Sequence, residues 1–258
     1  GLAFPNLFPE GTTCEDSFRL RKFHRQSTYH IARLSHKDNR FRRMLEYVFH
    51  LATNGIQKQL DQGMFLMHSV GQSRYKNVGE LRKAIENKNE DIIMDLNRVS
   101  SKVKGSPSWF DGKCRQLQSI DLEKGPCTFF LTLSCNEYAW NDVQAYLLEK
   151  NPDLIEKVKQ QGIHVLFSDT VSFMRYWEWR VDAFIEAALM PKDKKGQIKE
   201  SIFGRKCSYY YGRIEFQERG PPHVHMKIWL ENAPIYGIDP IEDVKALIEE
   251  NITCRLPN

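Results

Sequence analysis

The sequence feature that most constrains the fold is a pair of strand-like runs joined by a proline-rich turn. Residues 207–216 (CSYYYGRIEF) and 223–230 (HVHMKIWL) are rich in β-branched and aromatic residues, and QERGPP separates them. Proline cannot donate a hydrogen bond to a strand ladder, so we expect Pro221 and Pro222 to lie in the connection. The two runs therefore predict a β-hairpin with a long turn.

Two histidines open the second run. On a strand, residues two apart face the same way, so His223 and His225 share a face and Val224 points into the core. Two neutral imidazoles on one face can bind a divalent cation, but a metal site needs at least one more ligand. Glu215 at the end of the preceding run and Gln217 just after it can fold back against them. The alternative is that both imidazoles lie on the solvent face of a sheet without a ligand.

Other protein classes also use an HxH element, and two of them fit poorly. The nucleotide-hydrolysing triad proteins carry a third histidine two residues further on, where this chain has Lys227. Metal-dependent amidohydrolases place HxH after an early barrel strand, whereas here it lies near the C-terminal end. An unrelated HxH metallohydrolase is therefore the weakest of the hypotheses.

The rest of the chain predicts an α+β fold. Periodic apolar residues indicate helices over 13–35, from Asp38 and Asn39 to 52, and over 78–99, 136–150, 168–189 and 240–250. Residues 127–135 (CTFFLTLSC) predict a buried strand. The turn-rich stretch KGSPSWFDGK marks a boundary near 105–113. We expect a mainly helical N-terminal region, 1–112, followed by a core, 113–258, with an antiparallel sheet flanked by helices.

Basic residues are concentrated in the N-terminal region, although the net charge of the chain is only +4. From Arg19 to Arg43 there are nine Lys or Arg and a single acid, Asp38, with aromatic residues interleaved. Cations neutralise phosphates and rings stack on bases, so this pattern indicates nucleic-acid binding. A solvated basic helix face is the alternative. The electrostatic candidates are Arg19, Arg21, Lys22, Arg25, Arg40, Arg42 and Arg43.

Composition excludes several classes. The six cysteines show no CxxC spacing, which argues against a disulfide framework or a zinc ribbon and favours a reducing, intracellular setting. No window approaches the roughly 18 apolar residues of a membrane span, so we expect no membrane partner. The start, GLAFPNLFPEG, lacks the basic and apolar regions of a signal peptide. We expect the chain to be a piece of something longer.

Three separated motifs carry a resemblance to a known family. FFLTLSCN (129–136) and IEFQERGPPHVHMKIWL (214–230) resemble the first two motifs of rolling-circle replication initiators, in particular the Rep domain of Helitron transposases. This domain is an HUH (His-hydrophobic-His) endonuclease, and His223-Val224-His225 matches the HUH element. AFPNLFPEG (3–11), Tyr29 with Arg33-Leu34, and DNRF (38–41) look like the Helitron-like N-terminal region. The resemblance covers nearly the whole chain.

The resemblance implies a nuclease that nicks and transfers single-stranded DNA through a tyrosine. His223, His225 and a third polar residue would hold Mg²⁺ or Mn²⁺, with Glu215 the first choice by matching position and Gln217 the next. A helicase domain in the same polypeptide and a nuclear location are also expected. The candidates for DNA contact near the site are Asn136, Trp140, Arg219 and Lys227.

One departure from the family pattern concerns the nucleophile. The family places its tyrosines in a Y-x-x-x-Y-type motif downstream of the HUH element, and after His225 this chain has a single tyrosine, Tyr236. We therefore expect the nucleophile downstream of this chain, which would be inactive alone. Some relaxases carry an N-terminal tyrosine, which would point to Tyr29 or Tyr47. The alternative function is a catalytically inactive or domesticated DNA-binding module derived from a Helitron.

Overall fold

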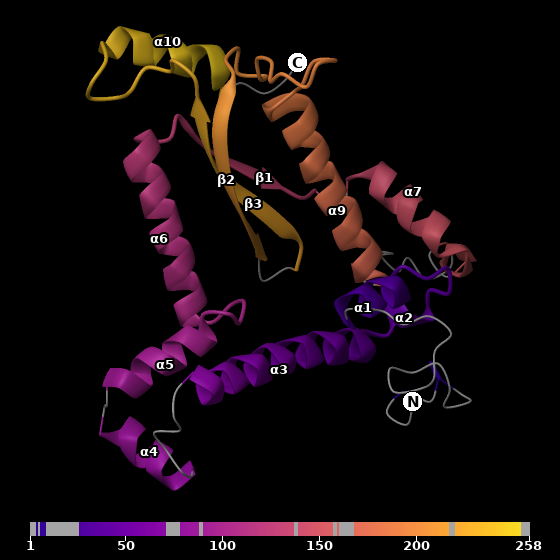
Figure 1. Cartoon of the computed structure of the whole chain (residues 1–258). Helices are drawn as coiled ribbons and strands as arrows, with labels where there is room; N and C mark the ends of the chain where they lie inside the picture. The colour runs from indigo at the N-terminus through magenta and orange to yellow at the C-terminus, as the bar shows by residue number, and fades with distance from the viewer. Residues whose placement is uncertain are drawn as a thin grey trace. The chain divides into compact units, whose positions relative to one another are not determined.

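The computed structural model describes residues 4, 6–8, 26–70, 78–87, 90–136, 139–156, 159, 168–216 and 220–253. The packing of the chain divides it into two units, residues 1–116 and 117–258 (Figure 1). The boundary expected near 105–113 is not a loop throughout, because a helix, α6 (Pro107–Lys124), begins inside it and continues past Gln116. Proline is favoured at the first position of a helix, so Pro107 in this turn-rich stretch starts a helix there.

The described part of unit 1 is helical, as predicted. Its helices are α1 (Gln26–Leu34), α2 (Arg40–Arg43), α3 (Leu45–Val70), α4 (Val78–Glu86) and α5 (Glu90–Ser100), followed by the start of α6. The helix expected from Asp38 is interrupted at Met44, whose backbone is extended (φ −84°, ψ 96°), and then continues to Val70. The helix expected over 78–99 is two helices, and Asn87, a poor helix former, follows the first of them. The early part of the helix expected over 13–35, residues 13–25, lies outside the described residues.

Aromatic side chains build the core of unit 1. The buried members of this cluster are Leu7, Phe8, Phe41, Tyr47 and Leu51. The Arg33 guanidinium lies 4.9 Å from the Phe41 ring centroid and 5.2 Å from that of Tyr29, and its Nε donates to the Tyr29 hydroxyl. A cation packed on rings in this way covers apolar surface while it keeps its hydrogen bonds.

The described residues of unit 2 contain a three-stranded antiparallel sheet, which confirms the α+β prediction. Its strands are β1 (Phe129–Ser134), β2 (Cys207–Phe216) and β3 (Pro222–Leu230), in the spatial order β1-β3-β2. β2 and β3 form the predicted hairpin. Pro222 was expected in the connection but is the first residue of β3, opposite Phe216. A proline is tolerated at the first position of a strand, so the ladder loses little there.

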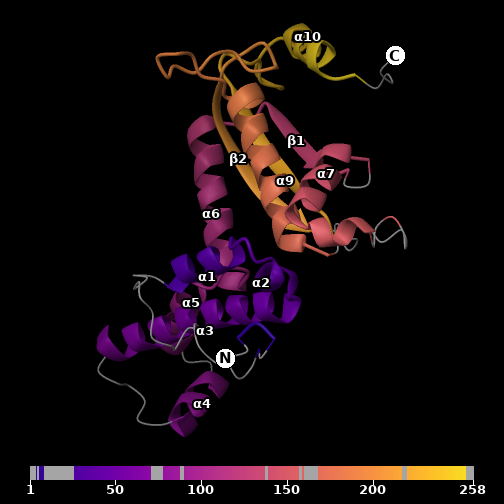
Figure 2. The same cartoon turned by 90° about the vertical axis from the view of Figure 1, so that its right-hand side faces the viewer.

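One face of this sheet forms the core of unit 2. Val224, Met226, Ile228 and Leu230 of β3 are buried in a hydrophobic cluster with residues of α7 (Asn141–Lys150), η1 (Pro152–Leu154), α9 (Thr170–Phe184) and the π-helical turn η3 (Ile185–Leu189). Figures 1 and 2 both show α7 and α9 on the same side of the sheet. Gly212 on β2 lies so close to Met226 that an added Cβ would be 3.3 Å from the Met226 Cγ.

The opposite face of the sheet is the one that carries the two histidines. Residues 127–135 were expected to form a buried strand, but burial alternates along β1, and its outward side chains Phe130, Thr132 and Ser134 are exposed. The end of α6 lies against the far end of this face, where the Trp229 Nε1 donates to the Gly125 carbonyl at 2.9 Å. The last helix, α10 (Ile241–Asn251), follows Pro240 as predicted. Among the described helices, none has the length and apolarity that a membrane crossing requires.

Candidate metal centre

Three side chains on the outward face of the β2–β3 hairpin form one cluster. Glu215 lies directly opposite His223 in the strand register, and His225 is the next residue of β3 on that face. The Glu215 Oε2 is 3.8 Å from the His223 Nε2 and 3.6 Å from the His225 Nε2. The three potential ligand atoms all lie within 4.8 Å of one another. The hairpin therefore brings together the histidine pair and the acid that sequence reasoning placed first.

The spacing within this cluster is too long for direct hydrogen bonds between Glu215 and the histidines. Donor–acceptor distances in protein hydrogen bonds are about 2.7–3.2 Å, and both distances from the Glu215 Oε2 exceed that range. Metal–ligand bonds of about 2.0–2.2 Å place two ligands of one ion roughly 3.0–3.5 Å apart. The distances of 3.6 and 3.8 Å exceed this range too, so an ion shared by all three groups would require a small inward movement of the carboxylate. Two imidazoles and one carboxylate would supply three ligands to a divalent ion.

A neighbouring strand contacts His225, and a residue of its own strand contacts Glu215. The Thr132 Oγ1 lies 2.8 Å from the His225 Nδ1, and these residues are direct cross-strand partners. The Arg213 Nε lies 3.3 Å from the Glu215 Oε1, so the other carboxylate oxygen is the one that faces the histidines. When the Nδ1 of a histidine donates to an outer partner, its Nε2 presents a lone pair to a metal. Thr132 and Arg213 thus orient His225 and Glu215 toward a common point.

His223 is held differently. Its side chain is buried at 8% exposure, and its Nδ1 has no hydrogen-bond partner among the described residues. Packing, and not a hydrogen bond to its ring, therefore sets its orientation in the described part of the chain. Its ring meets that of His225 edge-on, with the centroids 4.6 Å apart. The two imidazoles form an asymmetric pair, one fixed by hydrogen bonding and the other by burial.

Comparison with known families identifies the chain. A family model described as the Helitron helicase-like domain at the N-terminus matches residues 28–228 of the 258. The chain belongs to this Helitron-like family. The predicted resemblance is confirmed, and the match includes FFLTLSCN, Glu215 and both histidines, whereas AFPNLFPEG lies before it. No curated protein and no solved structure matches the chain.

Several predicted site residues of this Helitron-like domain lie outside the described part of the chain. They are Arg19, Arg21, Lys22 and Arg25 of the basic region, together with Gln217 and Arg219 of the β2–β3 connection. Their roles stay predictions.

The three described arginines among the predicted DNA-contact residues of this region, Arg40, Arg42 and Arg43, have intramolecular partners. Arg40 binds the Asp38 carboxylate, with 2.6 Å between Nη2 and Oδ2, and this hydrogen bond lowers the pKa of Asp38. Arg42 is buried, and its Nη1 donates to the His36 carbonyl. Arg43 is half-buried. Arg42 therefore stabilises the turn before α2. The exposed positive charge of this helix comes from Arg40 and from the half-buried Arg43.

The described DNA-contact candidates of unit 2, Asn136, Trp140 and Lys227, also have intramolecular contacts. The Lys227 Nζ lies 3.0 and 2.8 Å from the two carboxylate oxygens of Asp121 on α6, a contact that sequence reasoning missed. Trp140 precedes α7, and the Arg180 guanidinium lies 4.1 Å from its ring centroid. Asn136 is exposed, and its carbonyl accepts the Trp140 N–H. The Lys227 charge is thus already partly neutralised in the folded domain.

The tyrosines weighed as nucleophiles differ in exposure. Tyr29 and Tyr47 of unit 1 are each only 3% exposed, and this burial keeps their side chains from a nucleic-acid strand. Tyr236 in unit 2 is 79% exposed.

Cysteine does not contribute to the Glu215–His223–His225 cluster among the described residues. Burial raises the pKa of the Cys207 thiol to about 11.

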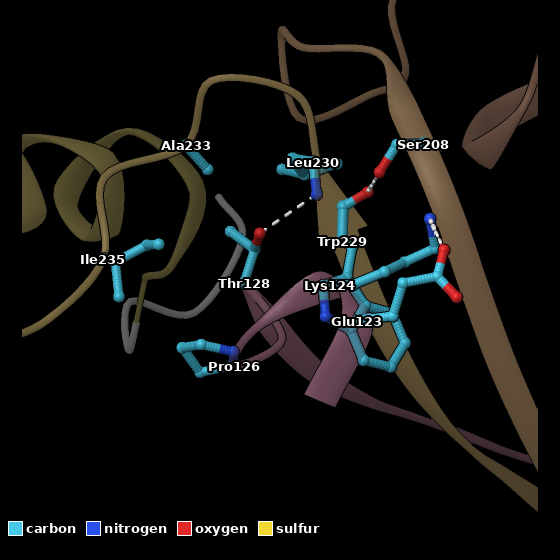
Figure 3. A pocket seen from close by; sticks show the side chains of 9 residues that line it. All are labelled: Glu123, Lys124, Pro126, Thr128, Ser208, Trp229, Leu230, Ala233 and Ile235. Atoms are coloured by element: carbon cyan, nitrogen blue, oxygen red, sulfur yellow. Dashed lines mark hydrogen bonds and ion pairs between the residues drawn. The ribbon is translucent and has the colours of Figure 1, made fainter. Parts of the chain in front are cut away.

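A shallow pocket lies at the other end of the sheet (Figure 3). Its volume is about 260 Å³, and it is lined by Glu123, Lys124, Pro126, Thr128, Ser208, Trp229, Leu230, Ala233 and Ile235. Trp229 is four residues from His225, the nearer of the two histidines along β3, which corresponds to about 13 Å at roughly 3.3 Å per residue. The pocket is therefore separate from the Glu215–His223–His225 cluster.

Proposed function

We propose that this Helitron-like domain is the metal-holding part of an endonuclease that nicks and transfers single-stranded DNA. The observation that carries the proposal is the Glu215–His223–His225 cluster on the open face of the sheet. Membership of the Helitron-like family supports it, because nicking of single strands is the activity implied by the HUH element.

The chain's own residues would bind the ion and position the phosphodiester. The His223 Nε2, the His225 Nε2 and the Glu215 Oε2 are the three donors, and Arg213 and Thr132 keep two of these groups in place. A divalent ion bound there would act as a Lewis acid on the scissile phosphate and orient it. Of the two ions expected from the sequence, Mn²⁺ accepts imidazole nitrogen more readily than Mg²⁺, which prefers oxygen ligands.

The nucleophile in this scheme would be a tyrosine hydroxyl, which the family pattern places downstream of the HUH element. Its oxygen would bond to phosphorus as the phenolic proton is lost. The bond from phosphorus to the 3′ oxygen would break and that oxygen would take up a proton, which gives a 5′-phosphotyrosine and a 3′-hydroxyl. A tyrosine hydroxyl has an ordinary pKa of about 10, so it needs an activated phosphate to react at neutral pH. The Glu215–His223–His225 cluster would supply that activation.

The test is the metal dependence of single-strand binding by the whole 258-residue chain. A fluorescent single-stranded oligodeoxynucleotide is titrated with the protein in Mn²⁺ and in EDTA. We expect tighter binding in Mn²⁺ for the wild type and for His50→Ala, an exposed histidine of α3. The gain should disappear in His225→Ala. Equal affinity with and without Mn²⁺ in the wild type would contradict the proposal.

A further inference from the structure

Phe130 is an exposed aromatic side chain beside the Glu215–His223–His225 cluster. It is 64% exposed and lies on the outward face of β1, directly opposite Lys227. Its ring is nearly parallel to the imidazole of His225, with 5.4 Å between centroids and 20° between planes. Single exposed apolar residues are common, so its exposure alone indicates little. Its position is informative, because an open ring surface lies next to a candidate metal ligand.

We propose that Phe130 is the stacking platform for an unpaired nucleobase next to the phosphate at the cluster. This inference rests on the proposed function and adds which part of the substrate Phe130 would contact, namely an unpaired base. Bases stack on exposed aromatic rings on sheet surfaces in several single-strand binding folds. Inside a duplex both faces of a base are covered by its neighbours. A ring that lies on a sheet can therefore take only a base that is unpaired and free to turn.

The charges on this face favour nucleic acid over an apolar peptide as the occupant. Arg213 is paired with Glu215, and Lys227 is paired with Asp121, so these four side chains carry no net charge together. With a divalent cation bound at the cluster, the same face becomes positive and attracts phosphate. An apolar peptide would gain nothing from that charge. A nucleotide would make two favourable contacts, one between its phosphate and the cluster and one between its base and Phe130.

The platform selects strandedness and not sequence. Every base has a π-face, so stacking on phenylalanine discriminates weakly among the four bases. The affinity lost when one such ring is removed corresponds to about 5- to 150-fold. Phe130 would thus help to restrict the cluster to single strands without fixing the sequence that is cut.

The test compares Phe130→Leu and Phe130→Trp with the wild type, using the whole chain in Mn²⁺. Leucine keeps an apolar side chain without a π-face, and tryptophan keeps the face. The probes are a single-stranded oligothymidylate and a fully abasic oligodeoxynucleotide of the same length. We expect the wild type and Phe130→Trp to prefer the oligothymidylate. In Phe130→Leu, its affinity should fall about 5-fold or more while that for the abasic strand stays unchanged.

Mn²⁺ affinity, measured without DNA, separates the two ways of failing. If Phe130→Leu keeps both its Mn²⁺ affinity and the wild-type preference for the oligothymidylate, the proposal that a base stacks on Phe130 is wrong. The proposed metal site is then unaffected. If the wild type binds no Mn²⁺ and its DNA affinity is the same with and without Mn²⁺, the proposed function itself is wrong.

Discussion

The Oγ1 of Thr132 lies 2.8 Å from the Nδ1 of His225, across the β1–β3 ladder. The hydroxyl can accept a hydrogen bond from a protonated Nδ1. The Nε2 then keeps its lone pair, which is directed at the side occupied by Glu215. Outer hydrogen bonds of this kind fix both the tautomer and the ring angle of a metal-binding histidine.

Thr132→Val should therefore weaken Mn²⁺ binding by about 10- to 100-fold, the range typical for loss of such a partner. Thr132→Ser retains the hydroxyl and should bind nearly as the wild type does. Calorimetric titration with Mn²⁺ gives the affinities, and ¹⁵N NMR of the histidine rings reports the tautomer of His225.

A matched control for this prediction is Thr128→Val. The Thr128 Oγ1 accepts the Leu230 N–H at the opposite end of the sheet, so its loss also removes a side-chain hydrogen bond to β3. Mn²⁺ affinity should not change in this variant. An equal loss in both valine variants would show that Thr132 stabilises the sheet and does not orient the ligand.

The Lys227–Asp121 ion pair predicts a gain of DNA affinity on removal of the acid. In Asp121→Asn the ammonium loses its carboxylate partner and can bind a phosphate, which adds one counterion-releasing contact. The slope of log affinity against log salt should then steepen by about 0.7 for a single strand. Anisotropy titrations with one oligonucleotide at several salt concentrations measure that slope.

The double variant Asp121→Asn with Lys227→Met is the control. It should return to a slope close to that of Lys227→Met alone. If Asp121→Asn leaves the slope at the wild-type value, Lys227 does not reach the nucleic acid and its candidacy as a DNA contact is wrong.

The Asp142–Tyr176 hydrogen bond between α7 and α9 makes stability depend on pH. The Tyr176 hydroxyl lies 2.6 Å from the Asp142 Oδ2 and, with the nearby Arg180 charge, lowers the pKa of that carboxyl. A lowered pKa in the folded state gives stability that is present above the unfolded value, about 3.9, and is lost as pH falls through the folded value. Asp142→Asn should thus lose less stability than the wild type on acidification.

The midpoint of urea unfolding between pH 5 and pH 2.5 measures this difference. Tyr176→Phe removes the hydroxyl and should also flatten the profile, although less, because Arg180 remains. Parallel profiles for the wild type and Asp142→Asn would show that the hydrogen bond makes no contribution in solution.

The part of the site within the hairpin could be predicted from sequence because it is local. The i, i+2 spacing placed His223 and His225 on one face, and the short connection brought the preceding strand back against them. The prediction that Glu215 would face the histidines depended on antiparallel pairing alone, and the register places it opposite His223. Its role as a ligand stays a prediction.

The contacts from β1 and α6 could not be predicted in the same way. Thr132 is 93 positions from His225, and Asp121 is 106 positions from Lys227. A single sequence carries no information on which distant strand pairs with β3 or in which register. The periodicity of β1 was also hidden, since its outward residues include Phe130, an apolar side chain that made the whole run look buried.

Helix breaks were missed for a related reason. Apolar periodicity continued across Met44 and across Asn87, and the interruption at each place depends on backbone geometry that periodicity does not report. The prediction of element type held better than the prediction of element ends.

The measurement that most directly tests the central claim is pulsed EPR of Mn²⁺ bound to the whole chain. Two imidazole nitrogens on one ion give distinct ¹⁴N couplings, and we expect them in the wild type and in His50→Ala. They should be absent in the double variant His223→Ala with His225→Ala. Mn²⁺ that binds the wild type without nitrogen coupling, or with couplings that survive in the double variant, would contradict the account.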